Sequence, residues 1–128
     1  MSPRINISSA SPWEDKVGYS RAVRIGNIIE VSGTTAVDGE KIVGDNVYVQ
    51  AKFIFEKIAS TLLKANASMR DVVRTRMFIT DISKWEEAGR AHFEFFKDIK
   101  PAATMVEISK LIDPKLLIEI EVTAVVEG

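Results

Sequence analysis

The fold is decided by two segments near the C-terminus, Pro101-Ala-Ala-Thr-Met-Val-Glu-Ile108 and Leu117-Ile-Glu-Ile-Glu-Val-Thr-Ala-Val-Val126. In both segments apolar and polar residues alternate with period two, which is typical of a β-strand with one buried face. In the second segment the polar face carries two carboxylates, and the apolar face carries Ile118, Ile120, Val122, Ala124 and Val126. Two carboxylates on the strand face opposite the buried apolar residues indicate that this polar face also has a function.

The sequence before these segments supplies the rest of a sheet. Gly26-Asn27 separates two apolar runs, 21–25 and 28–35, in the way that is typical of a β-hairpin. Apolar residues recur every three to four positions from about Asn46 to Lys64, which predicts a helix with one buried stripe. Residues 5–17 contain several Ser and one Pro, and we expect an irregular segment with at most one short edge strand.

Residues 72–81 read as the next strand, with Val73, Thr75, Met77 and Ile79 sharing one face. Before it, Ser68 and Asp71 resemble a capping pair for one short turn. After it, Ser83-Lys-Trp-Glu86 matches the S-x-x-E capping box and predicts a second helix to about Phe96, with Trp85 in its apolar stripe.

Two helices can cover only one face of the resulting mixed sheet. The other face is expected to carry charged and apolar side chains together: Glu30, Ser32, Arg74, Arg76, Glu107, Glu119 and Glu121, with Ile28, Phe78 and Met105 between them. Such a face is too apolar for solvent and too charged for a core. We therefore expect an α+β chain of one domain, residues 1–128, that packs against other copies of itself, with symmetric closure.

The composition of the chain disfavours or excludes several classes of function. The chain has 128 residues, of which 46% are apolar and 27% charged, as in ordinary soluble proteins of one domain. A net charge of -1 disfavours binding to nucleic acid or to a membrane surface. The absence of cysteine excludes a thiol nucleophile and cysteine-based zinc sites. The chain lacks a signal peptide and an apolar stretch of membrane-spanning length, so a cytoplasmic protein is expected.

Few residues suggest chemistry on their own. His92 is the only histidine, which excludes a histidine triad or a two-histidine metal site within one subunit, and a packed helix residue is favoured over a proton shuttle. Glu119 and Glu121 would lie about 7 Å apart on one strand face. They are suited to acid/base work or to ion pairs with arginines, and taken alone the ion-pair interpretation is favoured. Six scattered arginines, Arg21 among them, favour solvated or interface roles over an anion-binding patch.

The sequence as a whole is similar to the RidA family, also called YjgF or the L-PSP endoribonuclease-like family. The similarity follows the same order and spacing over nearly the whole chain, in Gly18-Tyr-Ser-Arg-Ala22, Gly26-Asn27, Val31-Ser-Gly33, Asp71-Val-Val-Arg-Thr75, Phe78-Ile-Thr-Asp81, Phe95-Phe96, Pro101-Ala102 and Ile118-Glu-Ile-Glu121. It implies a chorismate-mutase-like α+β fold and a homotrimer, with the sheets in a central barrel, helices outside and ligand clefts between subunits. The best-known members hydrolyse enamines and imines released by pyridoxal-phosphate enzymes to 2-oxo acids and ammonia, without metal or cofactor.

Family roles carry over residue by residue. The resemblance implies that Glu119 positions the attacking water and that Tyr19, Ser32 and Gly33 line the cleft. The arginine that binds the substrate carboxylate in active members falls on Ala103, and an asparagine of the second helix falls on Gly89.

The chain therefore resembles a branch of the family without this arginine, for which Arg76 is a candidate replacement and His92 a further candidate site residue. Two functions stay open: an enamine or imine deaminase of altered substrate preference, and a non-catalytic protein that binds a small metabolite. RNA cleavage rests only on the family's alternative name, and the near-neutral charge disfavours it.

Overall fold

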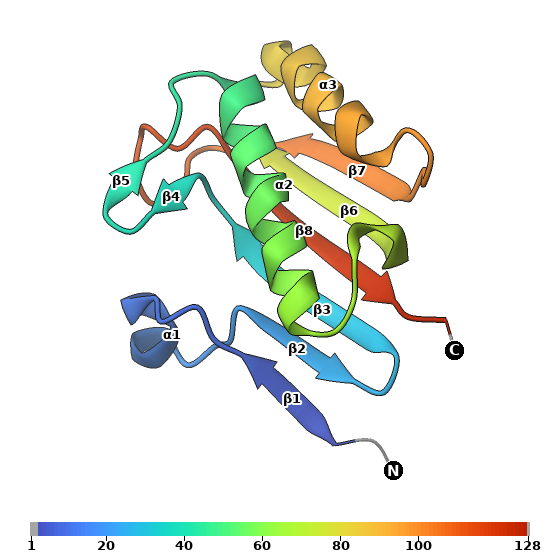
Figure 1. The fold of residues 1–128 in the computed structure, drawn as a ribbon. Helices are drawn as coiled ribbons and strands as arrows, with labels where there is room; N and C mark the ends of the chain where they lie inside the picture. Colours follow the sequence, from blue (N-terminus) through green and yellow to red (C-terminus); the bar gives the residue numbers. More distant parts are fainter. Residues whose placement is uncertain (1–2, 128) are drawn as a thin grey trace.

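The computed structural model describes residues 3–127, and in this range it contains a six-stranded sheet, a two-stranded ladder and three α-helices (Figure 1). The strands are β1 (Arg4–Ile7), β2 (Ala22–Ile25), β3 (Ile28–Thr34), β6 (Val72–Ile79), β7 (Ala102–Glu107) and β8 (Ile118–Val125), in the spatial order β1-β2-β3-β8-β6-β7. Neighbours are antiparallel except β6 and β7, which are parallel and connected through a helix. The predicted mixed sheet is confirmed.

The C-terminal strand β8 lies in the middle of the sheet, between β3 and β6. Its residues alternate between buried and half-buried along the whole strand. The buried row is Ile118, Ile120, Val122 and Ala124, none more than 1% exposed. Glu119 and Glu121 lie on the other face, as the period-two pattern predicts.

Helices α2 (Val47–Lys64) and α3 (Trp85–Phe96) both cover the same face of the sheet, and the other face is left open (Figure 1). The core between helices and sheet holds large side chains that are fully buried: Phe55, Phe96, Ile29, Ile54, Ile58, Leu62, Ile79, Ile118 and Ile120. Two helices on one face and an open second face agree with the sequence pattern.

Local signals explain the ends of α2. The Asn46 side chain accepts a hydrogen bond from the Val49 N–H at 2.9 Å, which caps the first turn. At the other end Asn66 adopts a left-handed φ of 59° and the helix stops. Arg24 of β2 donates to the Ala65 carbonyl at 2.7 Å, so the sheet holds the end of the helix.

The short edge strand expected within residues 5–17 is confirmed, because Arg4–Ile7 form edge strand β1. The expectation that the rest of this segment is irregular is wrong, because Pro12–Val17 form helix α1. Ser11 caps this helix by accepting from the Trp13 N–H, and Pro12 stands at its first positions. A further pair of strands, β4 (Val37–Asp38) and β5 (Lys41–Ile42), is connected by a turn at Gly39 and Glu40.

Two strand faces differ from the expectation. The pairing of β6 with β8 shifts between Val72 and Arg74, and this bulge leaves Val73 45% exposed while Val72 is buried. Met105 and Glu107 pair with Met77 and Ile79 of β6, whose side chains are buried under the helices. Residues paired in this way share a face, so Met105 and Glu107 do not belong to the open face.

The start of α3 also differs. The residue that caps the preceding turn, η2 (Ile82–Lys84), is Asp81, which accepts hydrogen bonds from the Ser83 N–H at 3.0 Å and the Ser83 hydroxyl at 2.7 Å. Ser83 is therefore not the helix cap, and Trp85 is 54% exposed. The capping pair before β6 is confirmed in the turn η1 (Met69–Asp71), because the Ser68 N–H donates to Asp71 at 2.8 Å.

The predicted domain of residues 1–128 includes Met1, Ser2 and Gly128, which lie outside the described residues. Among the helices of residues 3–127, none has the length and apolarity required to cross a membrane.

Candidate functional site

Glu119 is a half-buried carboxylate near the start of β8, on the open face of the sheet. Burial raises the pKa of Glu119, and the negative charge of Glu121 raises it further. The positive charge of Arg21 acts in the opposite direction. A carboxyl group with a raised pKa can accept a proton from water and return it to a leaving group, which an ordinary surface glutamate does less well at neutral pH.

A β-bulge at Ser32 and Gly33 brings the backbone close to this carboxyl group. Val31 pairs with Val122 but Thr34 pairs with Ile120, so β3 has one residue more than β8 in this interval. The Ser32 hydroxyl donates to the Ser20 carbonyl at 2.6 Å. A Cβ atom added to Gly33 would lie 2.9 Å from Cδ and Oε2 of Glu119. A side chain at this position would overlap the carboxyl group, so even alanine would push the end of the Glu119 side chain aside.

Tyr19 and Arg21 lie beside the same bulge. Gly18 ends α1 with a left-handed φ of 91°, and the exposed Tyr19 follows directly. The guanidinium carbon of Arg21 lies 5.8 Å from the Tyr19 ring centroid. Its Nη2 atom donates to the Gly33 carbonyl at 2.6 Å.

Tyr19, Ser32, Gly33 and Glu119 thus share one region, as the resemblance implies. Sequence reasoning treated Arg21 only as one of several scattered arginines. Its position directly after Gly18-Tyr19-Ser20 was the signal that could have singled it out.

Two of the other expected site residues, Gly89 and His92, line a second feature, a cavity of about 360 Å³ between the end of α3 and the start of β7. It is lined by Gly89, His92, Phe93, Phe96, Lys97, Lys100 and Pro101. Ala103 follows two residues after Pro101, is exposed, and pairs with Thr75 of β6. Lys97 and Lys100 are cationic residues of this cavity that sequence reasoning did not select.

His92 is a half-buried member of that cavity. Its Nε2 atom lies 2.9 Å from the Thr75 hydroxyl, and its ring packs edge-on against Phe55 with the centroids 5.7 Å apart. Burial lowers the pKa of His92, which favours the neutral imidazole. These contacts agree with the favoured interpretation of His92 as a packed helix residue.

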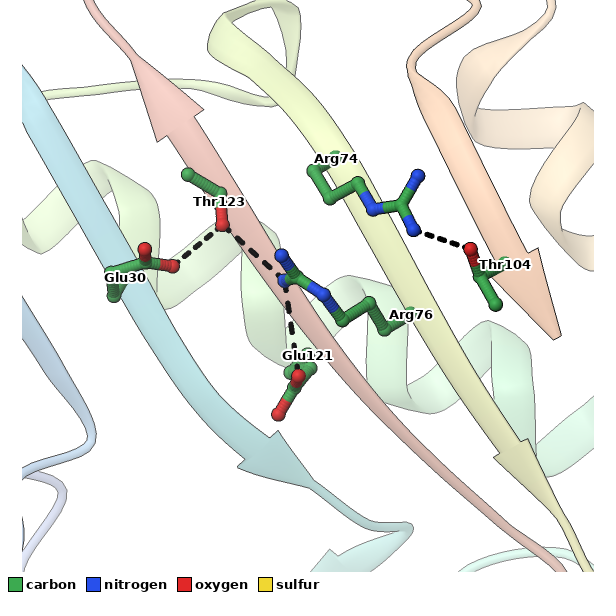
Figure 2. A network of polar contacts seen from close by, with 6 residues as sticks. All are labelled: Glu30, Arg74, Arg76, Thr104, Glu121 and Thr123. Carbon is green, nitrogen blue, oxygen red and sulfur yellow. Dashed lines mark hydrogen bonds and ion pairs between the residues drawn. The ribbon is translucent and has the colours of Figure 1, made fainter. Parts of the chain in front are cut away.

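Arg76 takes part in a network of polar contacts on the open face (Figure 2). Its Nη1 atom lies 3.8 Å from Glu121 Oε1 and 3.5 Å from the Thr123 hydroxyl, which in turn donates to Glu30 at 2.6 Å. The figure also shows Arg74 turned to the other side, where it contacts Thr104 of β7. Arg76 therefore belongs to a polar network with neighbouring strands, and within this chain it is not part of the cavity beside Ala103.

The fold keeps the two groups of residues apart. Thr75, the partner of Ala103, pairs with Val122, three residues beyond Glu119 and therefore about 10 Å further along β8. The side chain of Val122 is also on the opposite face of the sheet from that of Glu119. One chain thus presents the Glu119 region and the Ala103 region as two separate surfaces.

Known proteins resemble this chain over almost its full length. The sequence model of the family described as Endoribonuclease L-PSP matches residues 11–126. The chain belongs to this family, the RidA/YjgF family. A RutC family protein of Pyrococcus abyssi is 37% identical over 109 residues, which cover 83% of this chain and 84% of the relative. An uncharacterised protein of Streptomyces coelicolor is 33% identical over 119 residues, 92% of this chain and 89% of the relative.

The fold is equally close to solved structures of the RidA/YjgF family. The crystal structure of Rv2704 from Mycobacterium tuberculosis, described as a member of the highly conserved YjgF/YER057c/UK114 family, has a TM-score of 0.90 and 45% identity. It covers 97% of this chain, and the match covers 100% of the Mycobacterium chain. The expected family and fold are thereby confirmed. In the described part of the chain, no three His, Asp or Glu side chains are grouped as a metal site would require.

Proposed function

We propose that this RidA/YjgF protein is a homotrimer that binds a small molecule between subunits and hydrolyses an enamine or imine there. Glu119 would carry the chemistry. The observation that supports this most directly is the half-buried Glu119 carboxyl group, which has a raised pKa and lies against a glycine bulge beside Tyr19. A half-buried carboxyl group with a raised pKa and no salt bridge among the described residues is typical of a functional site.

The assembly is supported by the open face and by edge strand β7. Ile25 and Ile28 are paired neighbours of β2 and β3 and are 49% and 53% exposed. Almost all residues of β7 are exposed in the single chain, and its Val106 is 42% exposed. Adjoining exposed apolar residues are typical of an interaction surface. A second copy placed there would bring its own cavity residues toward the Glu119 region, which one chain alone does not do.

The proposed reaction needs no group beyond water and the protein. Water adds to the C=N carbon of the protonated imine as Glu119 accepts one of its protons, which gives a neutral carbinolamine. The protonated Glu119 then donates that proton to the amino group, the C–N bond breaks, and the hydroxyl proton passes to the departing ammonia as the C=O bond forms, so that ammonium is released. An enamine enters the same route when a proton adds to its carbon, which gives the protonated imine. The raised pKa of Glu119 suits both proton transfers.

Recognition of the substrate would differ from that of active relatives. Alanine at position 103 offers no hydrogen-bond donor to a carboxylate. Lys97 and Lys100, both shortly before β7, line the cavity, and Phe93 and Phe96 form its apolar wall. The cavity therefore fits a small anion with an apolar body, held by an ammonium group instead of a bidentate guanidinium.

The alternative is a protein that binds a small metabolite without turnover. The loss of the arginine at Ala103 favours it, because a charge-assisted hydrogen bond of about 1.5 to 3 kcal/mol is missing from both the bound substrate and the transition state.

One experiment separates the two functions. An imino acid is generated in situ by an amino-acid oxidase, and semicarbazide competes for it, so that hydrolysis lowers the yield of semicarbazone. Wild type is compared with Glu119→Gln, with Ala103→Arg and with Glu56→Gln, an exposed helix residue as matched control. The deaminase predicts hydrolysis by wild type and by the control, and none by Glu119→Gln at unchanged oligomer mass.

Hydrolysis by Ala103→Arg alone would mean that Glu119 is competent but that the natural ligand is not a simple amino-acid imine. Inactivity of every variant, together with thermal stabilisation of wild type by 2-oxo acids or other carbonyl compounds, would support the binding protein. Turnover by Glu119→Gln equal to wild type would refute the mechanism.

A further inference from the structure

Arg21 connects three parts of the Glu119 region. It stands directly before β2, its Nη2 atom donates to the Gly33 carbonyl at 2.6 Å, and its guanidinium carbon lies 5.8 Å from the centre of the Tyr19 ring. Gly33 in turn approaches the Glu119 carboxyl group so closely that no side chain fits between them. Arg21 thus holds the bulge from one side while Glu119 lies against the other.

One nitrogen atom of the Arg21 side chain has no hydrogen-bond partner in the described part of the chain. Among the side chains of residues 3–127, the Nε atom of Arg21 is the buried nitrogen or oxygen that has no hydrogen-bond partner. Buried donors are normally paired, and an unpaired one on a charged group is unfavourable for stability. An arginine retained under this penalty indicates a role other than stabilising the fold.

The charges around Arg21 and Glu119 are of mixed sign. Glu14 of α1 and Lys57 of α2 are close enough to interact electrostatically with Arg21. Lys57 also interacts electrostatically with Asp38. Glu121 of β8 repels Glu119, but it is itself 3.8 Å from Arg76 of β6. Arg21 is the cation that acts on Glu119 from within the same chain. Removing it would leave the carboxyl group with the repulsion of Glu121 alone.

We propose that Arg21 is a positioning residue of the Glu119 site, which fixes the Ser32-Gly33 bulge against the carboxyl group and supplies the positive charge that keeps this group ionised. It acts through Gly33 and Glu119 and does not require contact with the ligand. Its role in turnover rests on the proposed function, whereas its effect on Glu119 is a property of the protein without any ligand.

The test measures that property directly. The carboxyl carbon of Glu119 is followed by NMR over a pH titration in wild type, Arg21→Gln and Arg21→Lys, and Glu119→Gln gives the assignment. Arg21→Gln is expected to raise the midpoint, because the positive charge that lowers the pKa of Glu119 is lost. Arg21→Lys keeps the charge and is expected to stay close to wild type.

The matched control is Arg24→Gln, an arginine three residues further along that instead holds the end of α2. It should leave the midpoint of Glu119 unchanged. An equal midpoint in Arg21→Gln and wild type would overturn the proposal. If Arg21→Gln does not fold, Arg21→Lys provides the test. An upward shift of its Glu119 midpoint as large as the shift expected for Arg21→Gln would also overturn the proposal, because the positive charge retained by lysine would then have no effect on Glu119.

Failure of the proposed function would look different. If the midpoint shifts as expected but no variant hydrolyses an imine, Arg21 still sets the charge of Glu119 and only the reaction is wrong. If imines are hydrolysed, the acidic limb of the pH–rate profile should move upward in Arg21→Gln by the same amount as the midpoint, with a larger change in kcat than in KM.

Discussion

Replacing Gly33 by alanine should displace the Glu119 carboxyl group and leave the fold intact. The new Cβ would lie 2.9 Å from Cδ and Oε2 of Glu119, and ordinary contact begins at 3.4 Å, so the carboxyl group must move by about 0.5 Å or more. The backbone of Gly33 has no positive φ, so alanine brings no backbone strain. The atoms that must move are the end of a flexible side chain, and the cost in stability should stay below about 1 kcal/mol.

A shift of this size matters for chemistry. Misplacement of a reacting group by 1 Å can lower a rate by about 100-fold, so about 0.5 Å should lower it roughly tenfold. The assay combines urea unfolding, the NMR signal of the Glu119 carboxyl carbon and imine hydrolysis, with Ser60→Ala on the exposed side of α2 as control. A destabilisation above about 3 kcal/mol, or an unchanged Glu119 signal with unchanged activity, would refute this reasoning.

Three further substitutions have effects that can be predicted from the environment of a single side chain. Glu119→Gln should be more stable than wild type at neutral pH and should lose this advantage near pH 4.5. The reason is that the folded-state pKa of Glu119 is raised, so that wild type loses stability as the pH rises through this pKa. Urea unfolding at several pH values tests this prediction. His92→Gln should flatten the loss of stability below about pH 6.5, because the folded-state pKa of His92 is lowered and the neutral ring must be protonated on unfolding; an unchanged slope would contradict it. Gln50→Leu should cost about 3 kcal/mol or more in chemical unfolding, since fully buried Gln50 donates to the carbonyls of Gly44 and Lys115 and accepts from the Leu117 N–H.

Sequence patterns predicted the elements with strong periodicity. The hairpin around Gly26-Asn27, helix α2 and strand β8 appear where the patterns placed them, because each has its own local signal of turn residues, a 3.6-residue period or a two-residue period. Helix α1 escaped prediction because six residues are too few for a periodic stripe, although Ser11-Pro12 was a valid start signal.

The faces of β6 and β7 could not be predicted from alternation alone. A bulge at the start of β6 buries Val72 in place of Val73, and it arises from the register with β8. Met105 is directed toward the helices by its pairing with Met77 of β6, a partner 28 positions away in the sequence. Register of this kind is set by contacts distant in the sequence, so a local pattern does not contain it.

The sequence by itself determined the mixed sheet with a polar row on its last strand, and through the motifs of a family it selected Glu119, Tyr19 and the Ser32-Gly33 pair as candidate site residues. Only the tertiary structure decided how these residues meet: a bulge places Gly33 against Glu119, and Arg21, directly before β2, reaches the Gly33 carbonyl. It also separated Ala103 from Glu119 by face and by position along the sheet. The physical reason is that residue types and periods are local properties, whereas close approach and electrostatic environment depend on which distant strands are paired and in which register.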